Sequence, residues 1–179
     1  MFQEIAEKTS ALTGTSGITF SYRGLAEDAN CAVDRQMMER AALNMIANAL
    51  KFTPSGGCIQ MELCRNGKQF RFSVTDSGTG IPEKERAGLF TQYLREPSIE
   101  DTRSGIGLGM LLIRSAASHH GGAILVDFPK EAGTRVTMTF TNATCCEPML
   151  RSNLLRADYA GEQDHALIEL SEFLPLELY

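Results

Sequence analysis

The chain has 179 residues, of which 43% are hydrophobic, so we expect one globular domain with a substantial core. Its formal net charge of -5 argues against nucleic acid as the main partner. The sequence shows no signal peptide and no apolar run of about 18 residues that would span a membrane, so we expect a cytoplasmic protein with no direct membrane contact. The five cysteines lack paired C-x-x-C spacing, which favours reduced thiols.

Hydrophobic patterning predicts the elements of the first half of the chain. We expect a strand over residues 18–22, a short strand near residues 31–33, and then a long helix with Asp34 as its N-cap. Two strands over residues 58–65 and 68–75 follow, joined by Asn66-Gly67, which is the strongest short hairpin signal. The second of these strands alternates apolar and polar residues and leads directly to Asp76.

The second half begins with a short helix at Pro82 and ends in another hairpin. Residues 82–104 become charged and irregular after Leu94, and we interpret this segment as a lid. An apolar helix over residues 109–120 stops at Gly121-Gly122, and strands over residues 123–128 and 134–140 follow. This order predicts an α/β (α+β) two-layer sandwich, a mixed and mostly antiparallel sheet with helices on one face. We assign residues 1–140 to the domain and 141–179 to a C-terminal extension of unknown role.

A polar stripe runs along the long helix. At 100° per residue, Asn44, Asn48 and Lys51 share one side of a helix that is otherwise mostly apolar and is therefore expected to be buried. Buried amides and an ammonium need partners. A cation bound by the amide oxygens and an anion bound by Lys51 would satisfy all three, as metal plus polyphosphate does. A polar seam bonded to neighbouring strands would explain this helix equally well.

Two glycine clusters supply the remaining signals. Asp76 is followed by Ser-Gly-Thr-Gly-Ile, and glycines after a strand let a ligand approach the backbone closely. Gly105, Gly107 and Gly109 precede the apolar helix, where free N–H groups form an anion site. The spacing fits neither a P-loop nor the dinucleotide fingerprint.

Taken together, the order and spacing of these segments resemble the catalytic and ATP-binding domain of bacterial sensor histidine kinases, in the GHKL superfamily with the Bergerat fold. The resemblance covers residues 18–140. Residues 44–54 are similar to the family's N box, 76–81 and 105–110 to its two glycine boxes, Leu89-Phe90 with Tyr93 to its F box, and 118–122 with 133–134 to its closing segments.

The resemblance implies roles for individual residues. Asn48 would hold Mg²⁺ with help from Asn44, Lys51 would contact phosphate, and Asp76 would accept the adenine amino group. Thr134 could bond to Asp76 or to a water beside the base. The implied catalytic group is Asn44, Asn48 and Lys51, and the implied ATP-binding set is Asn44, Asn48, Lys51, Phe52, Asp76, Gly78, Gly80, Ile81, Phe90, Arg103, Gly105, Gly107, Leu108, Gly109 and Thr134.

One position distinguishes branches of the superfamily. The hydrolysing members carry a Glu four residues before the metal-binding Asn, where it activates water as a general base. This chain has Asn44 there, and an amide cannot take up a proton at neutral pH. We therefore expect ATP binding without rapid hydrolysis, which suits phosphoryl transfer to a separate acceptor.

The acceptor itself is missing from the sequence. His119 and His120 end a helix, where a favourable interaction with its C-terminus explains them, and His165 lacks the flanking acid and proline of a phosphoacceptor. The resemblance thus implies a sensor kinase's catalytic domain that uses ATP and Mg²⁺, with its own dimerisation and phosphoacceptor domain and a response regulator as partners. It also implies the cytoplasmic part of a membrane-anchored sensor. The alternatives are an anti-sigma-factor type serine kinase and a nucleotide-binding module without transferase activity.

Overall fold

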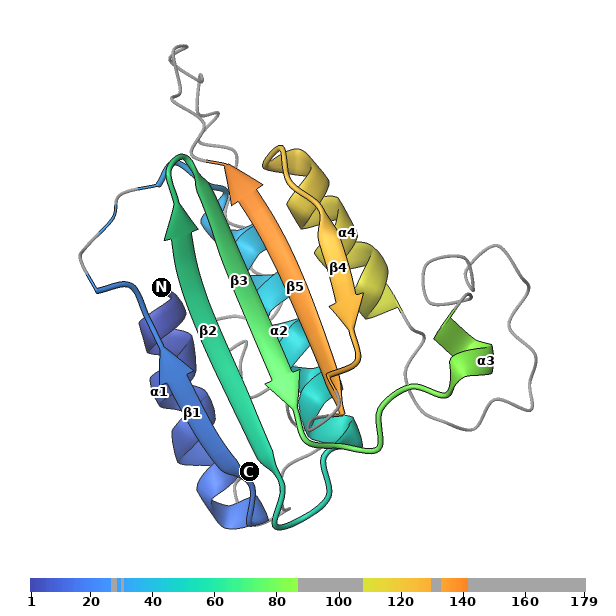
Figure 1. Cartoon of the computed structure of the whole chain (residues 1–179). Coiled ribbons are helices and arrows are strands. Elements are labelled where there is room, and N and C mark those ends of the chain that lie inside the picture. The colour runs from blue at the N-terminus through green and yellow to red at the C-terminus, as the bar shows by residue number, and fades with distance from the viewer. Residues whose placement is uncertain (27–28, 30, 87–107, 130–132, 142–179) are drawn as a thin grey trace.

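The fold is described from a computed structural model, which describes residues 1–26, 29, 31–86, 108–129 and 133–141. Its helices are α1 (Phe2–Thr13), α2 (Arg35–Phe52), α3 (Glu83–Arg86) and α4 (Leu108–His119), with a short 3-10 turn, η1 (Gly14–Ser16), after α1 (Figure 1). Its strands are β1 (Thr19–Arg23), β2 (Cys58–Asn66), β3 (Gln69–Asp76), β4 (Ile124–Asp127) and β5 (Thr134–Thr141).

The five strands form one mixed sheet. Their order across the sheet is β1-β2-β3-β5-β4 (Figure 1). β1 runs parallel to β2, and the other neighbouring pairs are antiparallel. The register of β3 and β5 pairs Asp76 with Thr134, so the end of one strand lies beside the start of the other. The predicted mixed, mostly antiparallel sheet is confirmed.

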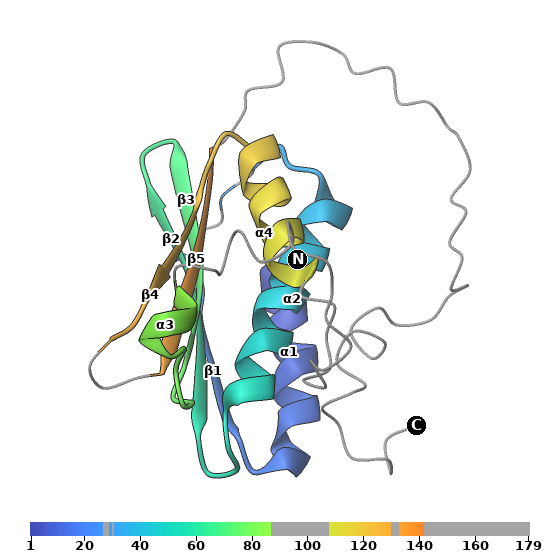
Figure 2. The same cartoon turned by 90° about the vertical axis from the view of Figure 1, so that its right-hand side faces the viewer.

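The three long helices pack on one face of the sheet, which gives the two layers seen in Figure 2. α2 lies centrally and buries eight of its residues, because its apolar side chains cover most of its circumference. The sheet meets it with alternate side chains such as Phe72, Val74 and Met138. α1 is anchored by Phe2, whose ring stacks on Phe72 with centroids 4.5 Å apart. The predicted two-layer sandwich is confirmed.

Local capping signals place the helix ends where the sequence predicts them. Asp34 caps α2, and its carboxylate accepts a bond from the Met37 N–H at 2.9 Å. α4 stops because Gly121 adopts a positive φ of 65° and Gly122 donates its N–H to the Ala117 carbonyl at 2.8 Å. None of the described helices combines the length and apolarity needed to cross a lipid bilayer.

Two details of the predicted elements are wrong. No strand forms at residues 31–33. This segment does not pair with the sheet and is held by the Cys31 and Val33 side chains, which pack against the core. The first hairpin turns one residue later than expected. Asn66 pairs with Gln69, so the turn residues are Gly67, at φ 60°, and Lys68.

Candidate functional site

The candidate site is built around the carboxylate of Asp76, the last residue of β3. The residue is only 6% exposed. Its Oδ1 accepts backbone N–H bonds from Gly78 at 2.8 Å and from Thr134 at 3.2 Å. Burial raises the pKa of this carboxyl above its ordinary value, and the two N–H groups oppose the rise. A hydrogen bond between Thr134 and Asp76, one of the two partners considered for Thr134, thus exists, and the backbone N–H of Thr134 donates it.

Close backbone packing fixes the loop that carries this carboxylate. The Thr79 N–H donates to the Phe52 carbonyl at the end of α2 (3.4 Å), and the Gly133 N–H donates to the Asp76 carbonyl (2.8 Å). A Cβ on Gly78 would overlap the Phe52 carbonyl. A Cβ on Gly133 would overlap the Gly78 carbonyl and stand 2.5 Å from the Asp76 Oδ1. Only glycine fits at these two positions.

A cavity of about 580 Å³ lies beside Asp76, between the sheet, α2 and the first turn of α4. Its walls are mostly apolar, and polar groups enter from Asp76, Thr134 and the stripe on α2. The lining residues are Met45, Asn48, Ala49, Lys51, Phe52, Val74, Asp76, Thr79, Gly80, Ile81, Pro82, Met110, Val126, Thr134 and Val136.

The polar stripe of α2 faces α4 rather than the strands. The Asn44 side chain donates to the Arg40 carbonyl of its own helix at 2.8 Å. Its Oδ1 lies 2.8 Å from where a Cβ on Gly109 would stand, so glycine lets the start of α4 approach this amide. The Asn48 amide contacts the Met110 sulfur at 3.9 Å. The alternative of a seam bonded to neighbouring strands finds no support in the hydrogen bonds of these two amides.

The donor set fits a purine nucleotide and a hard cation. A flat apolar ring suits walls of Val74, Val126 and Val136, and an amino group suits the buried carboxylate acceptor. Amide oxygens such as those of Asn44 and Asn48 are ligands that Mg²⁺ accepts. The Lys51 ammonium, 5.7 Å from the Phe52 ring centroid, lies at the same wall and suits an anionic group.

The structure brings most of the predicted site residues into one place. Seven of the fifteen line the cavity, namely Asn48, Lys51, Phe52, Asp76, Gly80, Ile81 and Thr134. Asn44 and Gly109 meet at the start of α4, and the Gly78 N–H donates to the Asp76 carboxylate. Leu108 opens α4, but its side chain is outside the described part. Phe90, Arg103, Gly105 and Gly107 lie outside the described residues, as do residues 87–104 of the predicted lid and residues 142–179.

Sequence reasoning missed the apolar walls, and it placed Gly133 in a closing segment without assigning it a packing role. Val74 lies two residues before Asp76 on the same face of β3, and it pairs with Val136, which pairs with Val126. The strand alternation used to find Asp76 also predicts this row of valines. Gly133 has no comparable signal, because its role depends on the β3–β5 register, which only the fold supplies.

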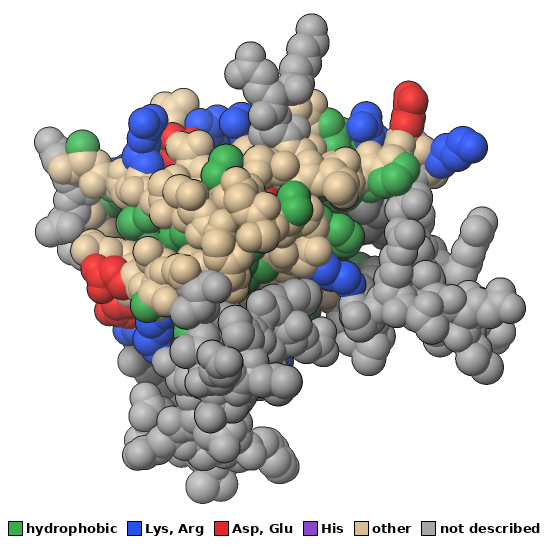
Figure 3. Space-filling view, turned by 90° about the horizontal axis from the view of Figure 1, so that it is seen from below, with side chains coloured by type: hydrophobic (Ala, Val, Ile, Leu, Met, Phe, Trp, Pro, Cys, Tyr) green, Lys and Arg blue, Asp and Glu red, His purple; other side chains and the backbone are tan. Residues whose placement is uncertain are grey.

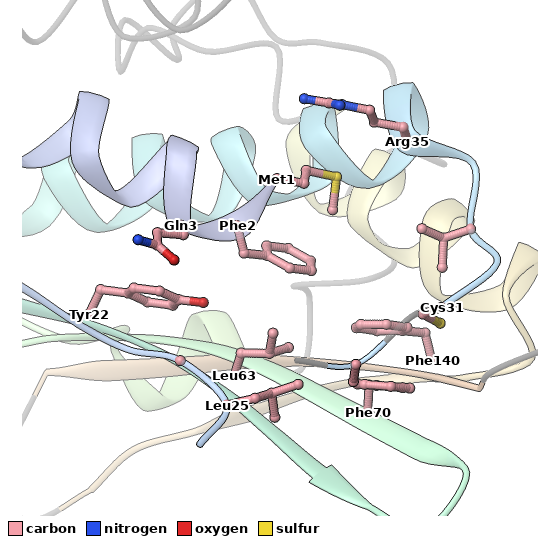
Figure 4. Close-up of a pocket in the computed structure, with 13 residues that line it drawn as sticks. Met1, Phe2, Gln3, Tyr22, Leu25, Cys31, Arg35, Leu63, Phe70 and Phe140 are labelled. Carbon is pink, nitrogen blue, oxygen red and sulfur yellow. The ribbon is translucent and has the colours of Figure 1, made fainter. Parts of the chain in front are cut away.

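The described part of the chain also contains a second sizeable cavity. Viewed from the end where α2 and β3 finish, the described surface is largely uncharged, with charged side chains mainly toward its edges (Figure 3). The second cavity, of about 410 Å³, lies between α1 and the β1–β2 edge and is lined by residues that include Phe2, Tyr22, Leu63 and Phe70 (Figure 4). It contains none of the predicted site residues.

Comparison with known proteins agrees with this geometry. The model of the family described as "Histidine kinase-, DNA gyrase B-, and HSP90-like ATPase" matches residues 33–144. The adaptive-response sensory kinase SasA of Synechococcus sp. (strain CC9311) is 37% identical over 105 residues, which are 58% of this chain and 27% of that protein. The circadian input-output histidine kinase CikA of Synechococcus elongatus is 32% identical, over 65% of this chain and 16% of its own length. The chain thus spans about a quarter or less of these curated relatives.

Solved structures share the fold. The catalytic domain of histidine kinase ThkA superposes with a TM-score of 0.64 at 23% identity, covering 78% of this chain and 91% of that domain. The mycobacterial sensor histidine kinase MprB gives a TM-score of 0.61 at 26% identity, covering 78% of this chain and 93% of that one.

Replacing Gly133 by Ala tests the packing around Asp76. The added Cβ would displace the Asp76–Thr134 contact, so we expect destabilisation of about 1–3 kcal/mol in urea unfolding. Gly14→Ala is the control, because its backbone is helical and nothing lies within 4 Å of the added Cβ. Equal unfolding free energies for the two variants would contradict the close approach.

Proposed function

Because the chain belongs to the family of histidine kinase-, DNA gyrase B- and HSP90-like ATPases, we propose that it is the ATP-binding catalytic domain of a sensor histidine kinase. In this proposal it transfers the γ-phosphoryl group of ATP to a histidine on a separate dimerisation and phosphoacceptor domain. The observation that carries the proposal is a cavity lined by the buried carboxylate of Asp76. The stripe on α2 brings the amide oxygens of Asn44 and Asn48 to this place, and it carries no acidic residue.

Adenine recognition would rest on Asp76. Its carboxylate would accept the adenine amino group, while Val74, Val126 and Val136 would enclose the ring. Guanine would bring a carbonyl against the same carboxylate, leaving two acceptors opposed in a buried place. The glycines at 78 and 80 would leave room for the base, and Phe52 and Ile81 would border it.

The phosphate end would lie between α2 and the start of α4. Lys51 would contact a phosphate oxygen, and the free N–H groups at the α4 N-terminus, with those of Gly105 and Gly107, would hold the chain of phosphates. Asn48, assisted by Asn44, would hold Mg²⁺, and this ion would neutralise charge that develops on the phosphates during transfer. These residues would position the nucleotide, which is the main requirement of phosphoryl transfer.

Asn44 is also the reason to propose transfer rather than hydrolysis. Its side chain bonds to the Arg40 carbonyl and presents no proton acceptor to water. CikA is named as a histidine kinase, which favours the histidine kinase over an anti-sigma-factor type serine kinase. The proposed partners are the phosphoacceptor domain and a response regulator, and the proposed setting is the cytoplasmic part of a membrane-anchored sensor.

Magnesium dependence tests the role of Asn48. The Asn48→Ala variant loses the amide oxygen, so its ATP affinity should become nearly insensitive to added Mg²⁺ when measured by calorimetry. Asn66→Ala, at the exposed end of β2, serves as the control and should keep the Mg²⁺ response of the parent. A Mg²⁺ response retained in Asn48→Ala would assign this side chain a structural role only.

Phosphoryl transfer tests the proposed function itself. With labelled ATP, the isolated chain should hydrolyse slowly and carry no acid-labile phosphate. Mixed with the phosphoacceptor half of its parent protein, it should label that half's histidine, weakly because the two are not tethered. Asn44→Glu should raise hydrolysis by supplying a general base. Rapid turnover by the unmodified chain would refute the kinase proposal, and label on a serine of a co-purified protein would favour the serine kinase.

A further inference from the structure

The ring of His120 joins the C-terminal end of α4 to the N-terminal end of α2. The residue is 8% exposed. Its Nδ1 lies 2.7 Å from the Ala116 carbonyl oxygen on α4, and its Nε2 lies 2.9 Å from the Asp34 backbone nitrogen. The expected interaction of His120 with the end of its own helix exists, but it involves only one ring nitrogen, because the other accepts from the N-cap residue of α2.

These two partners determine the state of the ring. A carbonyl can only accept, so Nδ1 must carry the hydrogen. A backbone N–H can only donate, so Nε2 must carry none. His120 is thus a neutral imidazole in the Nδ1–H tautomer. Its neighbour His119 meets it edge-on, with centroids 5.1 Å apart, but is exposed.

The bond to Asp34 supplies a hydrogen-bond acceptor that the sequence of α2 itself lacks. The N-cap amide of a helix has no partner within the helix, and a Glu or Gln three residues later often accepts from it. In α2 that position is Met37, which cannot do so. His120 takes over this function from 86 residues away, and it also satisfies a carbonyl in the last turn of α4.

The same two helices meet again at the candidate site. Farther along α2 from Asp34, and back along α4 from His120, Asn44 lies beside Gly109 and Asn48 contacts the Met110 sulfur. Since a helix rises about 1.5 Å per residue, a small axial slip between them would separate the amides of α2 from the start of α4. Misplacement of about 1 Å is enough to impair a phosphoryl-transfer site.

We propose that His120 is a positioning residue that sets the register of α2 against α4, and thereby the distance between the Asn44/Asn48 amides and the phosphate-binding start of α4. It touches neither nucleotide nor metal. Its effect on nucleotide binding rests on the proposed function, whereas the hydrogen-bond bridge itself can be tested without any ligand.

Nuclear magnetic resonance of the ¹⁵N-labelled full chain tests the bridge. The His120 imidazole should show the neutral Nδ1–H tautomer and a scalar coupling through the hydrogen bond between its Nε2 and the Asp34 amide nitrogen. An Nε2–H tautomer would overturn the proposal, because that nitrogen could no longer accept.

Two polar substitutions test the consequence for the site. In His120→Gln the amide oxygen reaches about as far as Nε2 and can still accept from Asp34, whereas in His120→Asn the side chain reaches only to the Nδ1 position. We expect ATP affinity about tenfold weaker in His120→Asn and close to that of the parent in His120→Gln, at a temperature where circular dichroism shows both folded. The Asn44 and Asn48 side-chain amide resonances should shift in His120→Asn alone.

His119→Asn is the matched control and should bind as the parent does. Equal affinities in His120→Asn and His120→Gln, with unshifted Asn44 and Asn48 resonances, would overturn the proposal while leaving the proposed function intact. If the parent itself bound no ATP, the proposed function would fail, and the resonance experiment would still decide whether the bridge exists.

Discussion

The buried carboxylate of Asp76 is the constraint on which the candidate site depends. A charge at 6% exposure must be compensated, and here the compensation comes from the N–H groups of Gly78 and Thr134. Those two donors belong to a loop and to β5, so holding them in place requires the β3–β5 register and close backbone contacts at Gly78 and Gly133. Burial still raises the pKa of the carboxyl, because desolvation of the charged form outweighs the opposing effect of the N–H groups.

The helical layer provides the opposite wall of the same cavity. α2 is buried against the sheet by its apolar residues, and its Asn44 and Asn48 side chains face α4. The first turn of α4 can approach because position 109 is a glycine, and its last turn is tied to the start of α2 through His120. The sheet, with its fixed carboxylate, and the helix pair together enclose one cavity, which is the proposed site for base and phosphates.

Many helix ends, turns and strands of the fold could be predicted from the sequence, because the residue patterns that determine them are local. Asp34 as an N-cap, the glycines at 67 and 121, and the alternation that ends at Asp76 each depend on neighbouring residues only. The features missed depend on contacts between distant segments. Gly133 matters because β5 starts beside the end of β3, and His120 matters because its partner is 86 residues away. The strand expected at residues 31–33 failed for a related reason, since an apolar segment can pack by side chains without pairing.

Binding of ATP and GTP to the parent and to Asp76→Asn, measured by calorimetry, tests the central claim most directly. The asparagine keeps an oxygen for the Gly78 and Thr134 N–H groups, so the fold should survive by circular dichroism. It removes the charged acceptor, at a cost of about 1.5–3 kcal/mol, or roughly tenfold to a hundredfold in ATP affinity. The parent should also prefer ATP over GTP. An ATP affinity unchanged in Asp76→Asn would contradict the assignment of this carboxylate to the adenine pocket.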